Sequence, residues 1–116
     1  MNISNQPAPR ISPEDVKAVV ASEFYFTAGH GVRGESEMGT SPAGRADGLN
    51  RITFCVLVLK NGHQIVGVNE GPVSAENFDP ELGRQFARQH AESQIWPLLG
   101  YELRSRLHDV RQLATL

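Results

Sequence analysis

The clearest structural signal in the chain lies at residues 51–69, which read RITFCVLVLKNGHQIVGVN. β-Branched and other apolar residues form two runs, one on each side of Asn61 and Gly62. An Asn-Gly pair between two such runs is a strong hairpin signal, because both residues tolerate the positive φ angles of a type I′ turn. The segment therefore predicts two antiparallel strands joined by a two-residue turn.

The turn also predicts which side chains share a face of the hairpin. A two-residue turn pairs Lys60 with His63 and fixes the register of every other pair. On one face the predicted pairs are Phe54 with Asn69, Val56 with Gly67, and Val58 with Ile65; on the other they are Cys55 with Val68 and Leu57 with Val66. Both faces are largely apolar and an isolated hairpin is marginal in water, so both need cover. We expect helices on one face and a second copy on the other face or the strand edges, which predicts a homo-oligomer.

A helix is predicted before the hairpin. Ser12 is a suitable N-cap and Pro13 suits the first helical position. An apolar stripe at helical spacing follows, formed by Val16, Val19, Val20 and Phe24. Residues 1–11 contain two prolines and no apolar periodicity, and are predicted to be a mobile tail outside the core.

The segment between this helix and the hairpin is rich in glycine, with glycines at positions 29, 31, 34, 39, 44 and 48. It contains almost no large apolar residues. We therefore expect a long flexible loop over about residues 28–50. Two interpretations stay open, a disordered linker and a functional lid.

Helical signals return after the hairpin. Asp79 and Pro80 repeat the pattern of an N-cap followed by proline, and the predicted buried stripe is Leu82, Phe86, Ala87, Ala91 and Ile95. Pro97 interrupts the pattern, so the C-terminal part is either one long kinked helix or two helices. The fold class predicted for residues 12–116 is a single α+β domain.

Composition excludes several classes of function. Eleven Lys and Arg against thirteen Asp and Glu give a net charge of −2, which does not provide the broad basic field of a general nucleic-acid binder. The longest apolar run, residues 54–59, is far shorter than the roughly 20 residues of a membrane span. The single cysteine, Cys55, cannot form an intrachain disulfide. We expect a protein of a reducing cytoplasm without a membrane partner.

No pattern in the sequence indicates catalysis. The four histidines, His30, His63, His90 and His108, lack metal-ligand spacing, and Cys55 sits between apolar residues as a packed thiol. Residues 29–34 match Gly-x-Gly-x-x-Gly, but a helix is predicted before them and a loop after them, which is the wrong context for a dinucleotide site. We expect no enzyme activity, no metal and no cofactor.

Two arginines are the best candidates for binding. Arg84 and Arg88 lie four residues apart, so one helix face presents both guanidinium groups, which can grip a phosphate or carboxylate. The alternative is a solvated face on which Glu81 pairs with Arg84 and Arg88 pairs with Glu92. Trp96 is either a core anchor or a stacking platform for a base.

Several strings together resemble one phage protein family. They are SEFYFTA at 22–28, TFCVL at 53–57, KNG at 60–62, ENFD at 76–79, GR at 83–84, AR at 87–88 and IWPLLGY at 95–101. They resemble the tailed-phage and prophage family named for phage N-four gene product forty-nine and phage Sf-six gene sixty-six, from about residue 12 to residue 107. The resemblance implies a small protein of the infected or lysogenic host cytoplasm and brings no known activity. Residues 68–72 depart from the family's Gly-Glu-Ser-like continuation, so a role in that turn does not transfer.

A second similarity suggests a ligand. The order of hairpin, residues 67–71, arginine-bearing helix and downstream Trp96 is similar to phage sponge proteins that sequester the cyclic nucleotides of Thoeris and CBASS immunity. This similarity implies that Arg84 and Arg88 hold phosphates, with Phe54, Asn69 or Trp96 near the base or ribose at a subunit interface. The functional hypothesis is a non-enzymatic phage protein that binds a small anionic, nucleotide-like ligand in counter-defence. The alternative is an inhibitor or modulator that binds a host enzyme.

Overall fold

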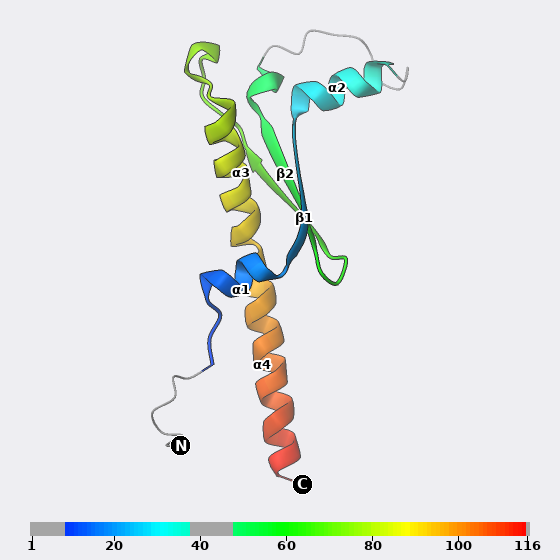
Figure 1. Cartoon of the computed structure of the whole chain (residues 1–116), viewed down its shortest axis with the longest axis vertical. Helices are drawn as coiled ribbons and strands as arrows, with labels where there is room; N and C mark the ends of the chain where they lie inside the picture. Colours follow the sequence, from blue (N-terminus) through cyan, green and yellow to red (C-terminus); the bar gives the residue numbers. More distant parts are fainter. Residues whose placement is uncertain (1–8, 38–47, 116) are drawn as a thin grey trace.

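The computed structural model describes residues 9–37 and 48–115, and it confirms the predicted α+β class. A three-stranded antiparallel sheet, in the order β1-β2-β3, has helices attached to it (Figure 1). The elements are α1 (Pro13–Ala18), β1 (Val20–Thr27), α2 (Ala28–Glu37), η2 (Leu49–Arg51), β2 (Thr53–Leu59), β3 (Gln64–Asn69), η3 (Ala75–Asn77), α3 (Pro80–Ser93) and α4 (Ile95–Ala114). Residues 1–8 of the predicted tail and 38–47 of the predicted loop lie outside the described residues.

The hairpin of β2 and β3 is confirmed, but its predicted register is wrong by one residue. The loop has three residues, because the Leu59 N–H donates to the His63 carbonyl at 2.8 Å and the Gly62 N–H donates to the Leu59 carbonyl at 2.9 Å. Gly62 has a φ of 89°, as the last residue of such a loop requires. The extra loop residue moves the side chains of β3 to the opposite face, so Ile65 lies beside Leu57.

A third strand occupies residues for which the sequence predicted a helix. The capping by Ser12 is confirmed, since its hydroxyl accepts from the Asp15 N–H at 3.2 Å, but α1 ends at Ala18. Residues 20–27 form β1 and pair with β2, with Phe24 opposite Val56. The predicted helical stripe through Val20 and Phe24 is therefore wrong, because pairing with the β2 edge outweighs a short helical pattern.

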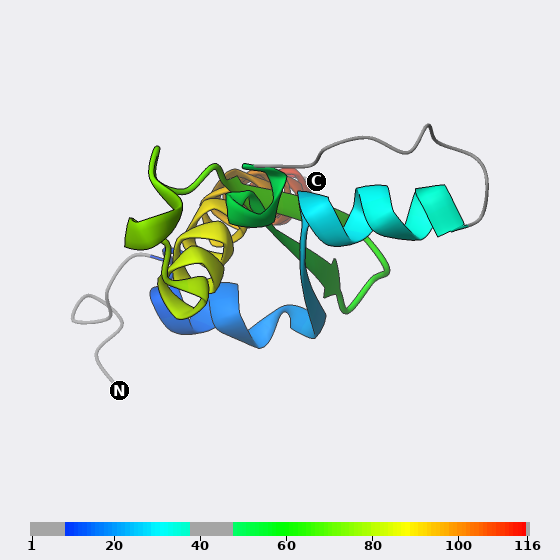
Figure 2. The same cartoon turned by 90° about the horizontal axis from the view of Figure 1, so that it is seen from above.

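Residues 28–37, predicted as loop, form the helix α2. Its first turn is fixed by a reciprocal cap: the Thr27 hydroxyl accepts from the His30 N–H, and His30 Nδ1 accepts from the Thr27 N–H, both at 3.1 Å. Its main contacts are with η2 and the end of β1. As a result α2 projects from the sheet, away from α3 (Figure 2).

The helix α3 covers one face of the sheet at close range. Its buried residues are Gly83, Ala87 and Ala91, whereas the predicted core residues Leu82 and Phe86 are 46% and 48% exposed. The approach is close because Gly67 of β3 lies beneath the helix: a Cβ built there would lie 2.7 Å from the Ala91 Cβ. Small side chains at this contact therefore replace the large ones that the periodicity predicted.

The core is small and lies between α1, the sheet, α3 and the start of α4. Its buried residues are Val16, Cys55, Leu57, Leu59, Ile65, Ala87, Ala91 and Ile95. Ile11 also packs against it, so the predicted tail contributes to the core at this residue. Gln94 separates α3 from α4, so the C-terminal part forms two helices, which is one of the two predicted arrangements. The helix α4 continues far beyond the sheet (Figure 1). The radius of gyration is 20.2 Å, against about 13 Å for a compact chain of this length.

The second face of the sheet is apolar and has no cover among the described helices. The strand alternation and the observed register place nine residues on it, which we call the open sheet face: Ser22, Phe24, Phe26, Phe54, Val56, Val58, Gln64, Val66 and Val68. Phe24, Phe26 and Val66 are 56%, 40% and 51% exposed. Phe26 and Phe54 stack with their ring centroids 5.4 Å apart.

Candidate functional site

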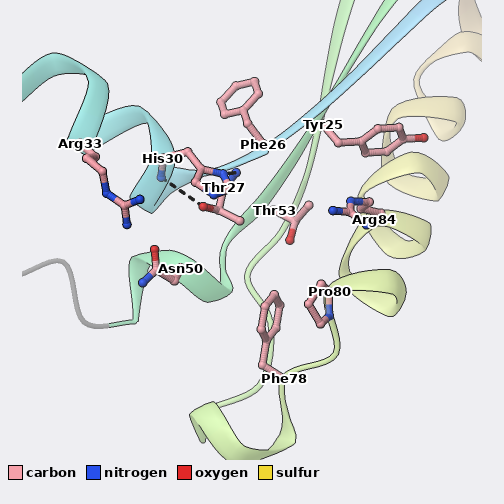
Figure 3. A pocket seen from close by; sticks show the side chains of 10 residues that line it. All are labelled: Tyr25, Phe26, Thr27, His30, Arg33, Asn50, Thr53, Phe78, Pro80 and Arg84. Atoms are coloured by element: carbon pink, nitrogen blue, oxygen red, sulfur yellow. Dashed lines mark hydrogen bonds between the residues drawn. The ribbon is translucent and has the colours of Figure 1, made fainter. Parts of the chain in front are cut away.

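A cleft of about 350 Å³ opens where β1 ends and β2 begins, between α2 and the start of α3 (Figure 3). Its size lies within the range of small-molecule sites. Six segments meet there, and they contribute Tyr25, Phe26, Thr27, His30, Arg33, Asn50, Thr53, Phe78, Pro80 and Arg84.

A buried hydroxyl without a partner lies at the base of this cleft. Thr53 is 3% exposed, and its Oγ1 has no hydrogen-bond partner among the described residues. Figure 3 shows this oxygen directed into the cleft, toward Phe78 and Pro80. Gly83 leaves it room, since a Cβ there would lie 2.7 Å from Oγ1. An unpaired buried hydroxyl costs about 1–3 kcal/mol, and this oxygen exposes almost no surface, so a group in the cleft would reach it only if the cleft widens.

Two arginines give the cleft a positive character. Arg33 comes from α2 and Arg84 from α3, and no acidic side chain is among the residues that line the cleft. Arg84 contacts Glu81 at 3.5 Å, and its side chain is 51% exposed. An exposed pair of this kind is worth little, so the guanidinium can turn to a ligand at low cost. The arrangement favours an anionic group.

The capping contact of α2 also sets the chemistry of His30. Because Nδ1 accepts the Thr27 N–H, the proton of the neutral ring is on Nε2. His30 lines the cleft together with Asn50 of η2. These two side chains add a ring N–H donor and an amide to the two guanidinium groups.

The rest of the cleft is apolar. Phe78 and Pro80, just before and at the start of α3, form its lower wall, and the ring of Tyr25 points toward α3 (Figure 3). Burial raises the pKa of Tyr25, against the opposing effect of its hydrogen bond with Arg88. A cleft with an aromatic wall and cationic side chains can hold a planar group and an anion together.

Of the two predicted arginines, only Arg84 lines the cleft. The Arg88 guanidinium donates to Glu92 at 2.7 Å and also to Glu23 of β1. Burial acts to lower the pKa of Arg88, but the hydrogen bonds to Tyr25, Glu92 and Glu23 outweigh it and raise the pKa. The two ion pairs of the alternative interpretation, Glu81–Arg84 and Arg88–Glu92, are present. The solvated face that it predicted is found at Arg84 but not at Arg88, whose side chain is mostly buried and also binds Glu23.

The other three predicted site residues lie apart from the cleft. Asn69 lines a separate groove of about 240 Å³ that also includes Phe86. Phe54 lies on the open sheet face, and Trp96, at the start of α4, is 39% exposed. The five predicted residues are therefore not gathered at one place.

Most of the residues that line the cleft do not stand out in the sequence. Thr53, Phe78, His30 and Arg33 come together only through tertiary packing. One signal was available, because Thr53 is a polar residue at a core-facing position of a strand that is otherwise apolar on that face.

Other chemistry finds no support within the described ranges. No three His, Cys, Asp or Glu side chains there gather closely enough for a metal ion, and none of the helices there could span a membrane. Cys55 is buried, as predicted, and burial raises the pKa of its thiol. This thiol is thus a packing group.

Comparison with known proteins identifies a family. No curated protein and no solved structure matches the chain. The family described as Phage protein (N4 Gp49/phage Sf6 gene 66) matches residues 11–107, a range that includes the sheet, α3 and every described residue of the cleft. The predicted resemblance is confirmed, and the chain belongs to the phage N4 Gp49/phage Sf6 gene 66 family.

Proposed function

We propose that this phage-family protein binds a small anionic ligand of the nucleotide class in the cleft between α2 and α3. The observation that carries the proposal is the lining of this cleft, which includes Arg33 and Arg84 and no acidic side chain, with the buried Thr53 hydroxyl, unpartnered among the described residues, beneath it. A ligand that widens the cleft enough to reach this hydroxyl would also satisfy it.

The cleft suits the two parts of a nucleotide differently. An anionic group fits between Arg33 and Arg84, because guanidinium groups donate two parallel hydrogen bonds to phosphate or carboxylate oxygens. A planar base fits against Phe78, where stacking is tolerant of base identity. Thr53 would then hold a polar edge of the ligand from below.

Binding without turnover is the activity we assign. A phage protein that holds a nucleotide in the host cytoplasm lowers its free concentration, which would blunt any host response that the nucleotide signals. This counter-defence role follows from capture alone and requires no catalytic group. It is consistent with the family and with the charge and shape of the cleft.

The test is a titration calorimetry panel of cyclic dinucleotides, cyclic trinucleotides, mononucleotides and inorganic phosphate against the full chain. We expect at least one nucleotide to bind and Arg84→Ala to weaken it about tenfold or more, the worth of one hydrogen bond to a charged group. The matched control is Arg106→Ala, which removes an exposed arginine paired with Glu102 on α4. The control should bind like the wild type. Absence of binding across the panel, or equal loss in both variants, would contradict the proposal.

A second candidate function is favoured by α4. Tyr101, Val110 and Leu113 on this helix are 75%, 62% and 70% exposed, which is unusual for large apolar residues. A host enzyme that docks on them would make the protein an inhibitor or modulator. If a host protein binds in stoichiometric amount to the wild type and to Arg84→Ala but not to Val110→Glu, this alternative is favoured over nucleotide capture.

A further inference from the structure

Within the same cleft, we infer that the helix α2 unfolds locally while the sheet and α3 stay folded, and that a bound ligand holds it in the folded state. The second half of this inference rests on the proposed function. The helix contributes Arg33 to the cleft, so its folding decides whether a ligand meets both arginines. Local unfolding of α2 would remove one of the two cationic walls.

The sequence of α2 makes it a weak helix by itself. Three of its ten residues are glycine. Each glycine disfavours a helix about three- to fivefold relative to alanine. Isolated helices shorter than about 12 residues are marginal in water even when they are rich in alanine. The helix also has no acidic residue in its first turn and no basic residue in its last turn, so its dipole lacks the usual complementary charges.

The contacts that hold α2 are gathered at its first turn. The Ala28 N–H donates to the Ile52 carbonyl at 2.9 Å, and the reciprocal cap described above fixes the same turn. Gly29, which is buried, packs so closely on Asn50 that an added Cβ would overlap with the amide of that side chain. Arg33 lies beyond these contacts, in the next turn of the helix.

Beyond the first turn, α2 has little support among the described residues. Every residue from 31 to 37 is exposed or half-buried. The helix packs on η2 and the end of β1 and projects away from α3 (Figure 2). Segments with few buried apolar contacts open locally at a lower free energy than the core of a protein. The part of α2 that carries Arg33 should therefore unfold first, with the first turn as its hinge.

A ligand in the cleft would oppose this unfolding. An anionic group between Arg33 of α2 and Arg84 of α3 contacts both walls, whereas the protein with α2 unfolded offers it Arg84 alone. A ligand that binds the folded state of α2 better shifts the equilibrium toward that state, by a factor that grows with its concentration relative to its dissociation constant. Ligand binding and the folding of α2 therefore strengthen each other.

The first experiment is hydrogen exchange of the full chain without ligand, followed by NMR. We expect the amides of residues 32–37 to have protection factors at least about tenfold lower than those of Ala87 and Ala91 in α3. They should also respond much less to low concentrations of urea, because local unfolding exposes little surface. This second difference separates local unfolding of α2 from unfolding of the whole chain.

Two glycines of α2 allow its stability to be raised without new contacts. No described atom lies within 4 Å of a Cβ added at Gly31 or Gly34. Gly31→Ala combined with Gly34→Ala should therefore raise the protection factors of α2 about tenfold, through helix propensity alone. The matched control is Gly100→Ala on α4, where an added Cβ is equally free. It should leave exchange in α2 unchanged.

The second experiment repeats the exchange with the nucleotide that binds tightest in the calorimetry panel. At about ten times its dissociation constant, we expect the protection factors of residues 32–37 to rise about tenfold, while those at the C-terminal end of α4 stay the same. Gly34→Pro breaks α2 and takes Arg33 out of the helical conformation, so it should weaken binding about tenfold or more. Gly34→Ala is the control at the same position and should bind at least as tightly as the wild type. Exchange of α3 establishes that both variants are folded.

The outcomes distinguish this inference from the proposed function. Local unfolding would be overturned, whether or not a ligand binds, if residues 32–37 exchange as slowly as α3 or gain no protection from the two alanines. A nucleotide that binds without protecting α2, or that binds Gly34→Pro as well as the wild type, would leave the proposed function in place and overturn the link to the helix. Absence of binding across the panel would contradict the proposed function and this link together, while exchange without ligand still decides whether α2 unfolds locally.

Discussion

Arg88 of α3 and Glu23 of β1, which lie 65 positions apart in the sequence, form an ion pair that ties the helix to the edge strand of the sheet. Arg88 is the better buried partner, with 22% of its side chain exposed against 50% for Glu23, and it also donates to Glu92 at 2.7 Å. The helix itself packs on β3 and β2, so this ion pair is a long side-chain link from α3 across to β1, two elements that both contribute residues to the cleft.

Loss of Arg88 should therefore destabilise the fold more than loss of Arg84. We expect Arg88→Met to lower the free energy of unfolding by about 2 kcal/mol, because two carboxylates lose their partner in a partly buried setting. Arg84→Ala, whose ion pair is exposed, should change it by less than about 0.5 kcal/mol. Urea unfolding measures both. Equal effects of the two substitutions would show that the Arg88 network is no more than a surface pair.

Thr53→Val should separate stability from binding. Valine has nearly the same shape, so the substitution removes a buried hydroxyl that has no partner among the described residues. We expect the free energy of unfolding without ligand to rise by about 1 kcal/mol, since the desolvation cost disappears. The affinity for the ligand of the cleft should fall. Thermal unfolding and calorimetry on the same variant check the two effects, and a stability loss would mean that the hydroxyl is satisfied.

Gly67→Ala should be among the most damaging single substitutions. The added methyl would meet the backbone of Ala87 and the side chain of Ala91, so α3 has to move off the sheet. We expect a loss of about 3 kcal/mol, the upper range for overpacking. Gly100→Ala on α4 is the control, because nothing lies within 4 Å of its added Cβ. It should stabilise the helix by about 0.5–1 kcal/mol. Urea unfolding of both variants tests the close packing of α3.

Stability should decline at alkaline pH. Burial raises the pKa of the Cys55 thiol above its ordinary value of 9.0, and it raises the pKa of Tyr25 as well. In the folded protein the thiol keeps its proton at pH values where the unfolded chain has lost it. This contribution is therefore complete below about pH 9 and is lost as the pH rises further. The free energy of unfolding, measured by urea from pH 7 to pH 10.5, should fall above pH 9. Cys55→Ala should show a shallower decline, and an unchanged slope would exclude the thiol as the cause.

The hairpin shows how far local sequence determines the fold. The Asn61-Gly62 pair correctly predicted two strands and their junction. It did not determine the loop length, because Gly62 serves equally well as the last residue of a three-residue loop. That one-residue difference reversed the predicted faces of β3, which no local pattern could settle while both faces are apolar.

Two further elements were mispredicted for tertiary reasons. Residues 20–27 match helical spacing at Val20 and Phe24, yet the edge of β2 offers a ladder of hydrogen bonds that makes them a strand. The glycines of α2 argue against a helix, but the reciprocal cap of Thr27 and His30 starts one. The helix starts at Pro13 and Pro80 were predicted correctly, because capping is local.

The candidate site was predictable only in part. Arg84 was found because its spacing from Arg88 is visible along one helix. Arg88, the other member of that pair, binds Glu23 of β1, which lies near it only in the folded sheet. Thr53 and Phe78 reach the same cleft from separate segments, so their meeting depends on how α3 packs on the sheet.

The most direct test of the cleft is a residue-resolved NMR titration of the isotope-labelled chain with a cyclic dinucleotide. If the nucleotide binds in the cleft, the amide signals of Thr27, His30, Thr53 and Arg84 should shift together and saturate with one affinity, and Arg84→Ala should weaken this response. Two results would contradict binding in the cleft. One is a shift of the α4 signals while the cleft signals stay unchanged, and the other is no shift at all at millimolar nucleotide.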